Sequence, residues 1–344
     1  MTTRSEAQPT AAPRSLRAVK KALVLVLALG LLLTVAVVSL RFGSLSFSTA
    51  EIWQALFGAE ETLAKIIVLD VRLPRMLVAL MVGANLALSG ALLQAVMRNP
   101  LADPGLTGVS TGAALAGVSI MLVFPQWGAL VPFAAFVGGA IACGLVFLLA
   151  WKRGLDPIRI ILAGVAVNAV FGGGTSLLSI LYSDRIQGIL MWLNGSIAGR
   201  SWHHVRLLAP YTAVALVVAM LCIKPANLLQ LGDDAARNLG LNVNVARTVL
   251  SFIAAFLAGI SVSTVGLIGF IGLIIPHVCR LLIGSDYKFM LPLSALLGSL
   301  LLITADAAAR TVFRPVELPV GIIMAVVGGP FFLYLLRKGG TYRV

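Results

Sequence analysis

Few side chains in this sequence have the types and spacing that covalent chemistry or metal binding requires. Cys143, Cys222 and Cys279 all lie inside apolar runs, and no two of them form a C-x-x-C pair. Cysteines in such surroundings are expected to be buried packing residues rather than ligands or disulfide partners. The histidines also lack the spacing of metal ligands. The sequence therefore predicts no metal site and no catalytic set, so we do not expect an enzyme.

The sequence also lacks a nucleotide-binding loop. No segment matches the Walker A pattern G-x-x-x-x-G-K-[ST], whose backbone would cradle phosphates. Ion-coupled carriers keep carboxylates near the bilayer centre, and Asp306 is the acidic candidate beside an apolar run. Asp306 precedes Arg310 by four residues, a spacing that favours a local helical ion pair as the simpler explanation. If transport is driven by ATP, a separate subunit must supply the ATPase.

Two arginines occupy an unfavourable place at the start of an apolar run. Arg72 and Arg75 flank Pro74, which suits the first turn of a helix. Cations beside a helix amino terminus oppose the helix dipole. We therefore expect both arginines to meet carboxylates from a partner protein or a neighbouring loop. Pairing with Asp70 and anchoring to lipid headgroups are the alternatives.

A short acidic segment, Leu-Gly-Asp-Asp-Ala-Ala-Arg-Asn-Leu-Gly at residues 231–240, lies between two apolar runs. Asp233 and Asp234 favour a helix start, and Gly240 offers a carboxy-terminal cap. Isolated helices shorter than about 12 residues are marginal in water. We therefore expect a short surface helix that packs against something, either a cytosolic partner or other loops of this chain.

Small and polar residues recur at every fourth position in the apolar run at residues 160–183. Gly164, Asn168, Gly172 and Ser176 form one stripe along the expected helix. Such stripes are typical of close helix packing. The alternative is the wall of a translocation path, because an uncharged wall suits a bulky solute that is passed on without being held.

Residues 99–108, Asn-Pro-Leu-Ala-Asp-Pro-Gly-Leu-Thr-Gly, hold two prolines and two glycines directly after an apolar run. A break of this kind is tolerated at membrane depth only where protein or water surrounds it. The segment is expected to be either a tight hairpin or part of a gate.

The elements that position these residues follow from composition. The chain has 344 residues, of which 59% are hydrophobic and 11% charged, whereas soluble domains carry about 25% charged residues. This excludes a soluble enzyme, a nucleic-acid-binding protein and a disordered regulator. The net charge of +13 is spread along short loops, where basic residues set the orientation of a membrane protein.

A helix needs about 20 apolar residues to cross a bilayer. The apolar runs predict an all-α polytopic membrane protein with ten spans and both termini in the cytoplasm. The membrane domain covers residues 22–338, between a disordered basic tail at 1–21 and a short cytoplasmic tail at 339–344. The runs are residues 22–40, 76–97, 104–151 (two spans joined by a turn at 124–127), 160–183, 207–223, 248–279 (two spans broken around 265–267), 289–305 and 318–336.

Five motifs together resemble the permeases of the FecCD family of type II ABC importers, which take up vitamin B12, haem or ferric siderophores. They are RLPR at 72–75, NPLADPGLTG at 99–108, LGDDAARNLG at 231–240, GFIGLIIPH at 269–277 and ELPVG at 317–321. The resemblance implies the type II permease fold with ten helices in the plasma (inner) membrane of a prokaryote. It implies a second permease subunit, identical or homologous, two cytosolic ATPases that bind the ATP, and an external substrate-binding protein. No cofactor is expected in this subunit, and lipid rather than nucleic acid surrounds it.

The resemblance also assigns roles to residues. Arg72, Arg75 and Arg310 would receive glutamates of the binding protein. The fifth span would line the translocation path, with Pro157 and Ile158 at an inner gate. The segment that matches the ATPase-coupling helix contains Gly232, Asp233, Asp234, Ala235, Ala236 and Gly240.

The substrate is expected to be a ferric siderophore moved inward. Residues 192–202, Trp-Leu-Asn-Gly-Ser-Ile-Ala-Gly-Arg-Ser-Trp, resemble the ferric-siderophore permeases more than the haem or cobalamin branches. Haem and vitamin B12 remain alternatives within the family. An ion-coupled secondary transporter is the rival from another class.

Overall fold

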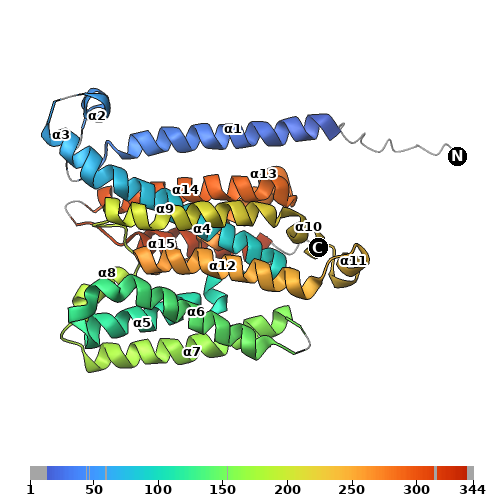
Figure 1. Ribbon diagram of the computed structural model, residues 1–344. Coiled ribbons are helices and arrows are strands. Elements are labelled where there is room, and N and C mark those ends of the chain that lie inside the picture. Colours follow the sequence, from blue (N-terminus) through green and yellow to red (C-terminus); the bar gives the residue numbers. More distant parts are fainter. Residues whose placement is uncertain are drawn as a thin grey trace.

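The computed structural model describes residues 14–338 except 44, 46, 59, 153, 314 and 315. Its long helices run side by side along one direction (Figure 1). Within the described residues, seven helices are long and apolar enough to cross a membrane, and three shorter apolar helices complete a set of ten. The ten are α1 (Arg14–Ser39), α4 (Leu73–Met97), α5 (Val109–Val123), α6 (Val131–Ala150), α7 (Pro157–Leu181), α9 (Trp202–Leu221), α12 (Val243–Val265), α13 (Ile271–Ile283), α14 (Tyr287–Thr311) and α15 (Val320–Lys338).

Short helices lie at the two ends of this bundle (Figure 1). One end, called the α2 end below, carries α2 (Thr49–Phe57), α3 (Leu63–Ile66) and α8 (Gln187–Leu193). The opposite end, called the α11 end, carries α10 (Ile223–Leu229) and α11 (Asp233–Asn238). The amino-terminal end of α1 lies at the α11 end as well.

The all-α fold with ten apolar helices is confirmed, and so are the two breaks expected inside long apolar runs. The first run is divided between α5 and α6 by a 3-10 helix, Pro125–Leu130. The second is divided where α12 ends at Val265 and α13 begins at Ile271. Gly266 and Phe270 have positive φ there (77° and 69°), so the backbone itself stops the helix.

Two expectations about helix starts are wrong. Helix α1 begins at Arg14, so residues 14–21 belong to a helix and not to the expected disordered tail; residues 1–13 and 339–344 lie outside the described residues. The helical run that contains α4 begins at Leu63, where Thr62 accepts a hydrogen bond from the Lys65 amide. A π-helical turn, Ile67–Arg72, comes directly before the first turn of α4. That first turn contains Pro74, which has no N–H to donate.

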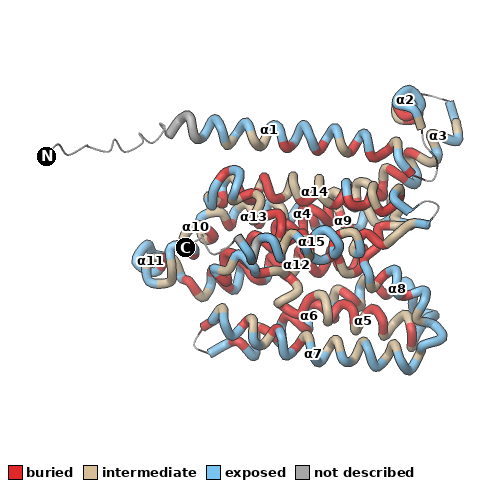
Figure 2. The backbone as a smooth tube through the Cα atoms, turned by 180° about the vertical axis from the view of Figure 1, so that it is seen from behind, coloured by how far each residue is buried: buried red, intermediate tan, exposed pale blue. Residues whose placement is uncertain are grey.

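Helix α4 is the central helix of the bundle, and most of its residues are buried (Figure 2). It lies against α14 and α13 through pairs of glycines. A Cβ atom on Gly83 would come within 2.3 Å of the Gly298 carbonyl oxygen, and one on Gly90 within 2.0 Å of the Gly272 carbonyl oxygen. Backbones can approach this closely only where side chains are absent.

The outer helices have the opposite character. Helix α1 covers one side of the bundle, and α5, α6 and α7 form a layer on the other side (Figure 1). Large apolar side chains of α1 and α7 are exposed, as the pale blue stretches of both helices in Figure 2 indicate. A water-soluble protein rarely exposes apolar surface on this scale, so these faces fit lipid or another subunit.

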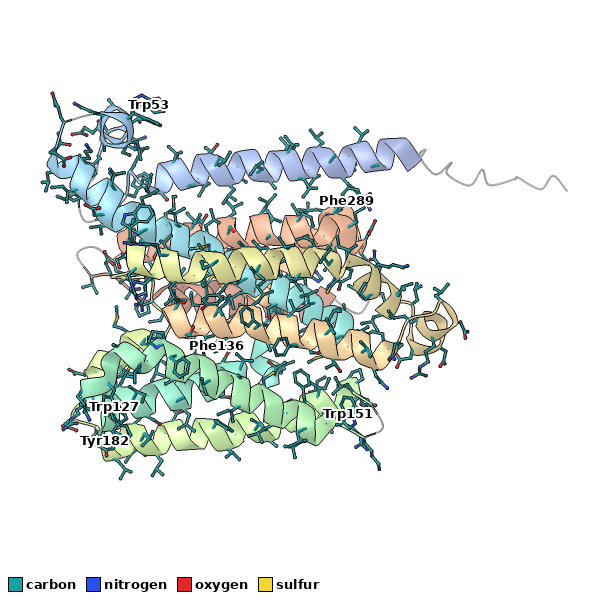
Figure 3. All side chains as sticks on the ribbon, in the orientation of Figure 1. Trp53, Trp127, Phe136, Trp151, Tyr182 and Phe289 are labelled. Carbon is teal, nitrogen blue, oxygen red and sulfur yellow. The ribbon has the colours of Figure 1, made fainter. Side chains whose placement is uncertain are left out.

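Aromatic side chains lie at both ends of the bundle as well as in its middle, where Phe136 is labelled in Figure 3. Trp53, Trp127 and Tyr182 lie at the α2 end, whereas Trp151 and Phe289 lie at the α11 end (Figure 3). Tryptophan and tyrosine are enriched where a membrane protein meets the lipid headgroups. Apolar helices with tryptophan at both of their ends therefore have the layout of a membrane domain.

The glycine contacts make a first prediction. Replacing Gly90 by valine should lower the thermal midpoint of the purified protein, because overpacking a tight contact costs about 1–3 kcal/mol. Gly144→Val is the matched control, since a Cβ atom at Gly144 meets nothing within 4 Å. Unfolding of both variants in detergent tests this, and equal midpoints would contradict the close approach of α4 to α13.

Candidate functional site

The small-residue stripe of α7 divides into two halves with different surroundings. In the first half, a Cβ atom on Gly164 would come within 1.9 Å of the Leu106 carbonyl oxygen. Asn168 donates to the Gly105 carbonyl oxygen over 2.9 Å and accepts from the Thr111 hydroxyl over 2.6 Å. This half packs against the segment at residues 99–108, as the packing interpretation predicts.

In the second half of the stripe, Gly172 and Ser176 border open space. Together with Thr111, Thr175 and Leu267 they line a recess of about 470 Å³. A Cβ atom on Gly172 would meet nothing within 4 Å. The described residues that line this recess are all uncharged. The same helix therefore serves packing in one half and offers an uncharged wall in the other.

The segment at residues 99–108 forms a tight turn within protein. The Asp103 carboxylate accepts a hydrogen bond from the Gly105 amide (2.8 Å), and Pro104–Thr107 is a turn of 3-10 helix. The Gln94 side chain of α4 donates to the carbonyl oxygens of Ala102 (3.3 Å) and Gly272 (3.2 Å). Neighbouring helices thus satisfy its polar groups, which is the condition for irregular backbone at membrane depth.

Three further stretches that the sequence singled out meet through glycines. A Cβ atom on Gly195 would approach the Leu267 carbonyl oxygen to 2.2 Å, and one on Gly266 the Trp192 carbonyl oxygen to 1.9 Å. The Gly321 amide donates to the Gly195 carbonyl oxygen over 3.1 Å. Residues 192–196, the α12–α13 break and the start of α15 therefore form one closely packed unit, and Leu267 of this unit also lines the recess.

Pro157 and Ile158, the expected inner gate, begin α7. Trp151 lies near the α11 end in Figure 3, and residues 151–156 lead from it into α7. The Asp156 carboxylate accepts hydrogen bonds from the amides of Ile158 (2.9 Å) and Arg159 (3.1 Å), which fixes the helix start. The Ile158 side chain is exposed.

At the α2 end, a buried ion-pair network ties α4 to α14. Arg75 donates from Nε and Nη2 to the Asp306 carboxylate over 2.9–3.1 Å. Its Nη1 atom lies 2.8 Å from a carboxylate oxygen of Glu317. Arg310 Nε lies 3.1 Å from Asp306, four residues earlier on the same helix. The expected local pair of Asp306 and Arg310 is therefore confirmed, but Asp306 also has a partner 231 residues away.

Hydrogen bonds from Arg72 and Arg310 hold the loop that follows α1. Arg72 donates to the Leu40 carbonyl oxygen (2.6 Å) and to the Leu45 carbonyl oxygen, and its guanidinium lies over the Phe47 ring. Arg310 donates to the Phe42 carbonyl oxygen over 3.0 Å. These contacts join the start of α4, the end of α14 and the loop after α1.

The structure therefore brings the three expected docking arginines together but buries them. Arg72, Arg75 and Arg310 are 5%, 7% and 6% exposed. The expectation that Arg75 meets carboxylates is confirmed, and they belong to this chain: Asp306 and Glu317 rather than Asp70. The dipole argument that led there is wrong, because α4 continues a helix that begins nine residues before Arg72.

At the α11 end, the predicted short helix is confirmed as α11. Asp233 at its start is held by Arg247 of α12, with Nη2–Oδ1 and Nη1–Oδ2 distances of 2.8 and 3.0 Å. Ala236 is fully buried, whereas Leu231 and Leu239 are 59% and 60% exposed. The interpretation that this segment packs against its own chain is confirmed by Asp233 and Ala236, whereas contact with a cytosolic partner stays a prediction.

Sequence reasoning gave no role to Glu317 or Arg247. Glu317 lies in the ELPVG motif, and the scarcity of acidic residues was a signal: a chain with 13 of them rarely places one beside a span without a partner. Nothing in the local sequence around Arg247 distinguishes it from the other cytoplasmic cations expected to set orientation.

The apolar helices of this bundle place the protein in the class of multi-pass membrane permeases. The FecCD transport family matches residues 31–338. The chain is 40% identical to the Fe(3+)-citrate import system permease protein YfmE of Bacillus subtilis (strain 168), over 94% of this chain and 98% of that protein. It is 38% identical to the hemin transport system permease protein HmuU of Yersinia pestis, over 91% and 95% of the two chains.

The fold has a solved counterpart. An inward-facing structure of a metal-chelate type ABC transporter superposes with a TM-score of 0.82 at 32% identity, covering 91% of this chain and 98% of that one. The chain belongs to the FecCD transport family, whose members are permeases of iron and siderophore ABC transporters rather than enzymes.

The buried network makes a second prediction. Arg75→Ala should lower the thermal midpoint strongly, because removing one partner of a buried ion pair costs about 3–5 kcal/mol. Arg75→Lys should not restore stability, since lysine lacks the fork that bonds Asp306 and Glu317 together. Lys65→Ala is the control, because its partner Glu61 has a side chain that is 76% exposed and exposed pairs contribute about 0–1 kcal/mol. Similar shifts for Arg75→Ala and Lys65→Ala would show that the network adds no stability.

Proposed function

We propose that this chain is the permease subunit of a binding-protein-dependent ABC importer that moves a ferric siderophore or a related ferric chelate into the cell. ATP hydrolysis is supplied by a separate cytosolic subunit. The observation that carries this proposal is the surface of α11. Its Asp233 and Ala236 anchor it to the bundle, while the exposed leucines at its two ends offer apolar contacts to a partner.

The distribution of charge supports one orientation of the chain in the membrane. In this orientation the α11 end and both termini face the cytoplasm, and the α2 end faces outward. The basic residues of the amino-terminal segment and of the loops at the α11 end fit the excess of positive charge on the cytoplasmic side. The membrane is the plasma membrane of a prokaryote.

The binding protein docks at the α2 end, near the arginine network. Arg75 bonds Asp306 and Glu317, Arg310 bonds Asp306, and Arg72 holds the neighbouring loop. The Glu317 side chain is 38% exposed and pairs with Arg75. It is therefore the carboxylate that an acidic side chain of the binding protein would most easily replace.

The recess beside Gly172 and Ser176 supports a bulky substrate. Hydroxyl groups, apolar side chains and Gly172 line it, and its described lining has no charge that would hold an ion tightly. The relatives are named for Fe(3+)-citrate and hemin, and another for Fe(3+)-hydroxamate. Ferric siderophores come first, with haem as the second candidate and vitamin B12 as the third. A second permease subunit, identical or homologous, would complete the path on the exposed side of α7.

The ion-coupled alternative finds less support. Its carboxylate candidate, Asp306, is bonded by Arg75 and Arg310 and does not line the recess. A coupling carboxylate has to release and bind a cation, whereas Asp306 is already bonded by two arginines of this chain.

Uptake of labelled ligands by cells with and without this gene tests both the substrate and the class of transporter. Cells that lack this gene, with redundant importers removed, should lose uptake of one labelled ligand among ferric citrate, ferric hydroxamates, haem and cobalamin. Restoring the gene should restore that ligand alone. Unchanged uptake of all four ligands would contradict the importer proposal for these solutes and would favour the ion-coupled alternative.

The exposed leucines of α11 make a further prediction. Leu239→Asp should lower ATP-driven transport by at least fivefold, because an aspartate in an apolar contact with the ATPase costs more than about 1 kcal/mol. Leu63→Asp is the matched control, since Leu63 is similarly exposed but belongs to the α2 end. Both variants are measured in vesicles for uptake and for association with the ATPase. Normal association of the Leu239 variant would remove α11 from the ATPase contact.

A further inference from the structure

Arg247 connects two elements to which the proposed function gives separate tasks. It lies on α12 and is 4% exposed. Its Nη1 and Nη2 atoms bond both carboxylate oxygens of Asp233, the first residue of α11. The same Nη1 atom also donates to the Leu155 carbonyl oxygen over 3.1 Å. One buried side chain therefore holds α11 and the loop before α7 together.

The loop on the other side of Arg247 leads directly into the start of α7. Leu155 is buried, and the next residue, Asp156, caps α7 through the amides of Ile158 and Arg159. The Leu155 carbonyl and the capping carboxylate thus belong to adjacent residues. A displacement of this carbonyl must move the cap and, with it, the first turn of the helix.

The loop also lies tightly on α12. Gly154 has φ of 136°, and a Cβ atom there would come within 2.4 Å of the Asn244 side-chain oxygen. Loop, α12 and α11 are therefore in direct contact around Arg247, with little free space to absorb a shift. Coupling between distant sites is carried by packed contacts and hydrogen-bond networks of this kind.

Arginine suits a connecting role for a chemical reason. Its guanidinium presents five donors in a rigid plane, so a carboxylate and a carbonyl can be bonded together in fixed relative positions. A lysine would bond the same acceptors from one point charge. Asp233 also lies 3.9 Å from Arg98, at the end of α4, but that contact is longer and Arg98 is partly exposed.

We infer that Arg247 is the positioning residue that transmits a movement of α11 to the amino-terminal end of α7. The inference rests on the proposed function, in which α11 contacts the ATPase, and on the expectation that Pro157 and Ile158 at the start of α7 form the inner gate. Arg247 touches neither ATP nor substrate. It acts through Asp233 on one side and through the Leu155 carbonyl on the other.

The test compares transport with ATP hydrolysis in the intact complex. The complex that purifies with this chain is reconstituted into vesicles, and the probe is radiolabelled ferric citrate or ferric hydroxamate, whichever the cells take up. Arg247→Gln should keep ATP hydrolysis but transport about tenfold less chelate per ATP, the range of an ordinary coupling free energy. Arg247→Lys should fall between the two. Lys224→Gln is the control, because Lys224 is an exposed cation of α10 at the same end of the bundle and does not belong to α11 or to the loop before α7.

A second readout follows the gate itself. A cysteine introduced at the exposed Ile158 is labelled by a maleimide with and without ATP, and the three native cysteines are buried. With Arg247 present, ATP should change the labelling rate; with Arg247→Gln, the change should disappear. A residue that only stabilised the fold would leave this ATP-dependent change intact in the complexes that assemble.

The outcomes separate the inference from the proposal beneath it. If Arg247→Gln keeps both the wild-type transport per ATP and the labelling change, the inference is wrong. If Arg247→Gln does not assemble, Asp233→Asn decides, because Arg247 then keeps its bond to the Leu155 carbonyl while its pair with α11 is weakened. If the wild-type complex itself shows no ATP-driven transport, the proposed function fails and the inference falls with it.

Discussion

The close approach of α4 to α13 and α14 is the contact on which the other sites depend. Gly83 and Gly90 let α4 lie against backbone rather than against side chains, and lipid offers no hydrophobic driving force that could replace such packing. One end of α4 carries Arg75 and the other carries Gln94 and Arg98. A single tightly held helix therefore sets the position of the arginine network, the turn at residues 99–108 and one neighbour of α11.

An arginine network lies at each end of the bundle, and both networks use charge in the same way. At the α2 end, Arg75 bonds Asp306 and Glu317, so that α4, α14 and the start of α15 are joined. At the α11 end, Arg247 bonds Asp233 and a loop carbonyl. Arginine serves both places because its planar fork bonds two acceptors at once. In contrast to these networks, the described lining of the recess beside α7 has no charge.

Two stretches of irregular backbone interrupt the helices of the bundle. The turn at residues 99–108 lies between α4 and α5, and the break at residues 266–270 separates α12 from α13. Each is satisfied by neighbours: Gln94 and Asn168 bond the first, and the Ser196 amide donates to the Val265 carbonyl oxygen at the second. Leu267 and Thr111, next to these two breaks, contribute to the recess. The interruptions therefore place loop residues beside the proposed path.

The ten spans, the breaks near 124–127 and 265–267, the short helix at α11 and the family could all be predicted from the sequence. These depend on the length of apolar runs, on proline and glycine, and on motifs, all of which are local. The sequence did not predict that Arg75 meets Asp306 and Glu317, that α4 continues a helix from Leu63, or that the stripe from Gly164 to Ser176 divides between packing and open space. These points required the folded structure, because they depend on which helices lie side by side and how closely. That arrangement follows from contacts between glycines and between charges that are far apart in the chain.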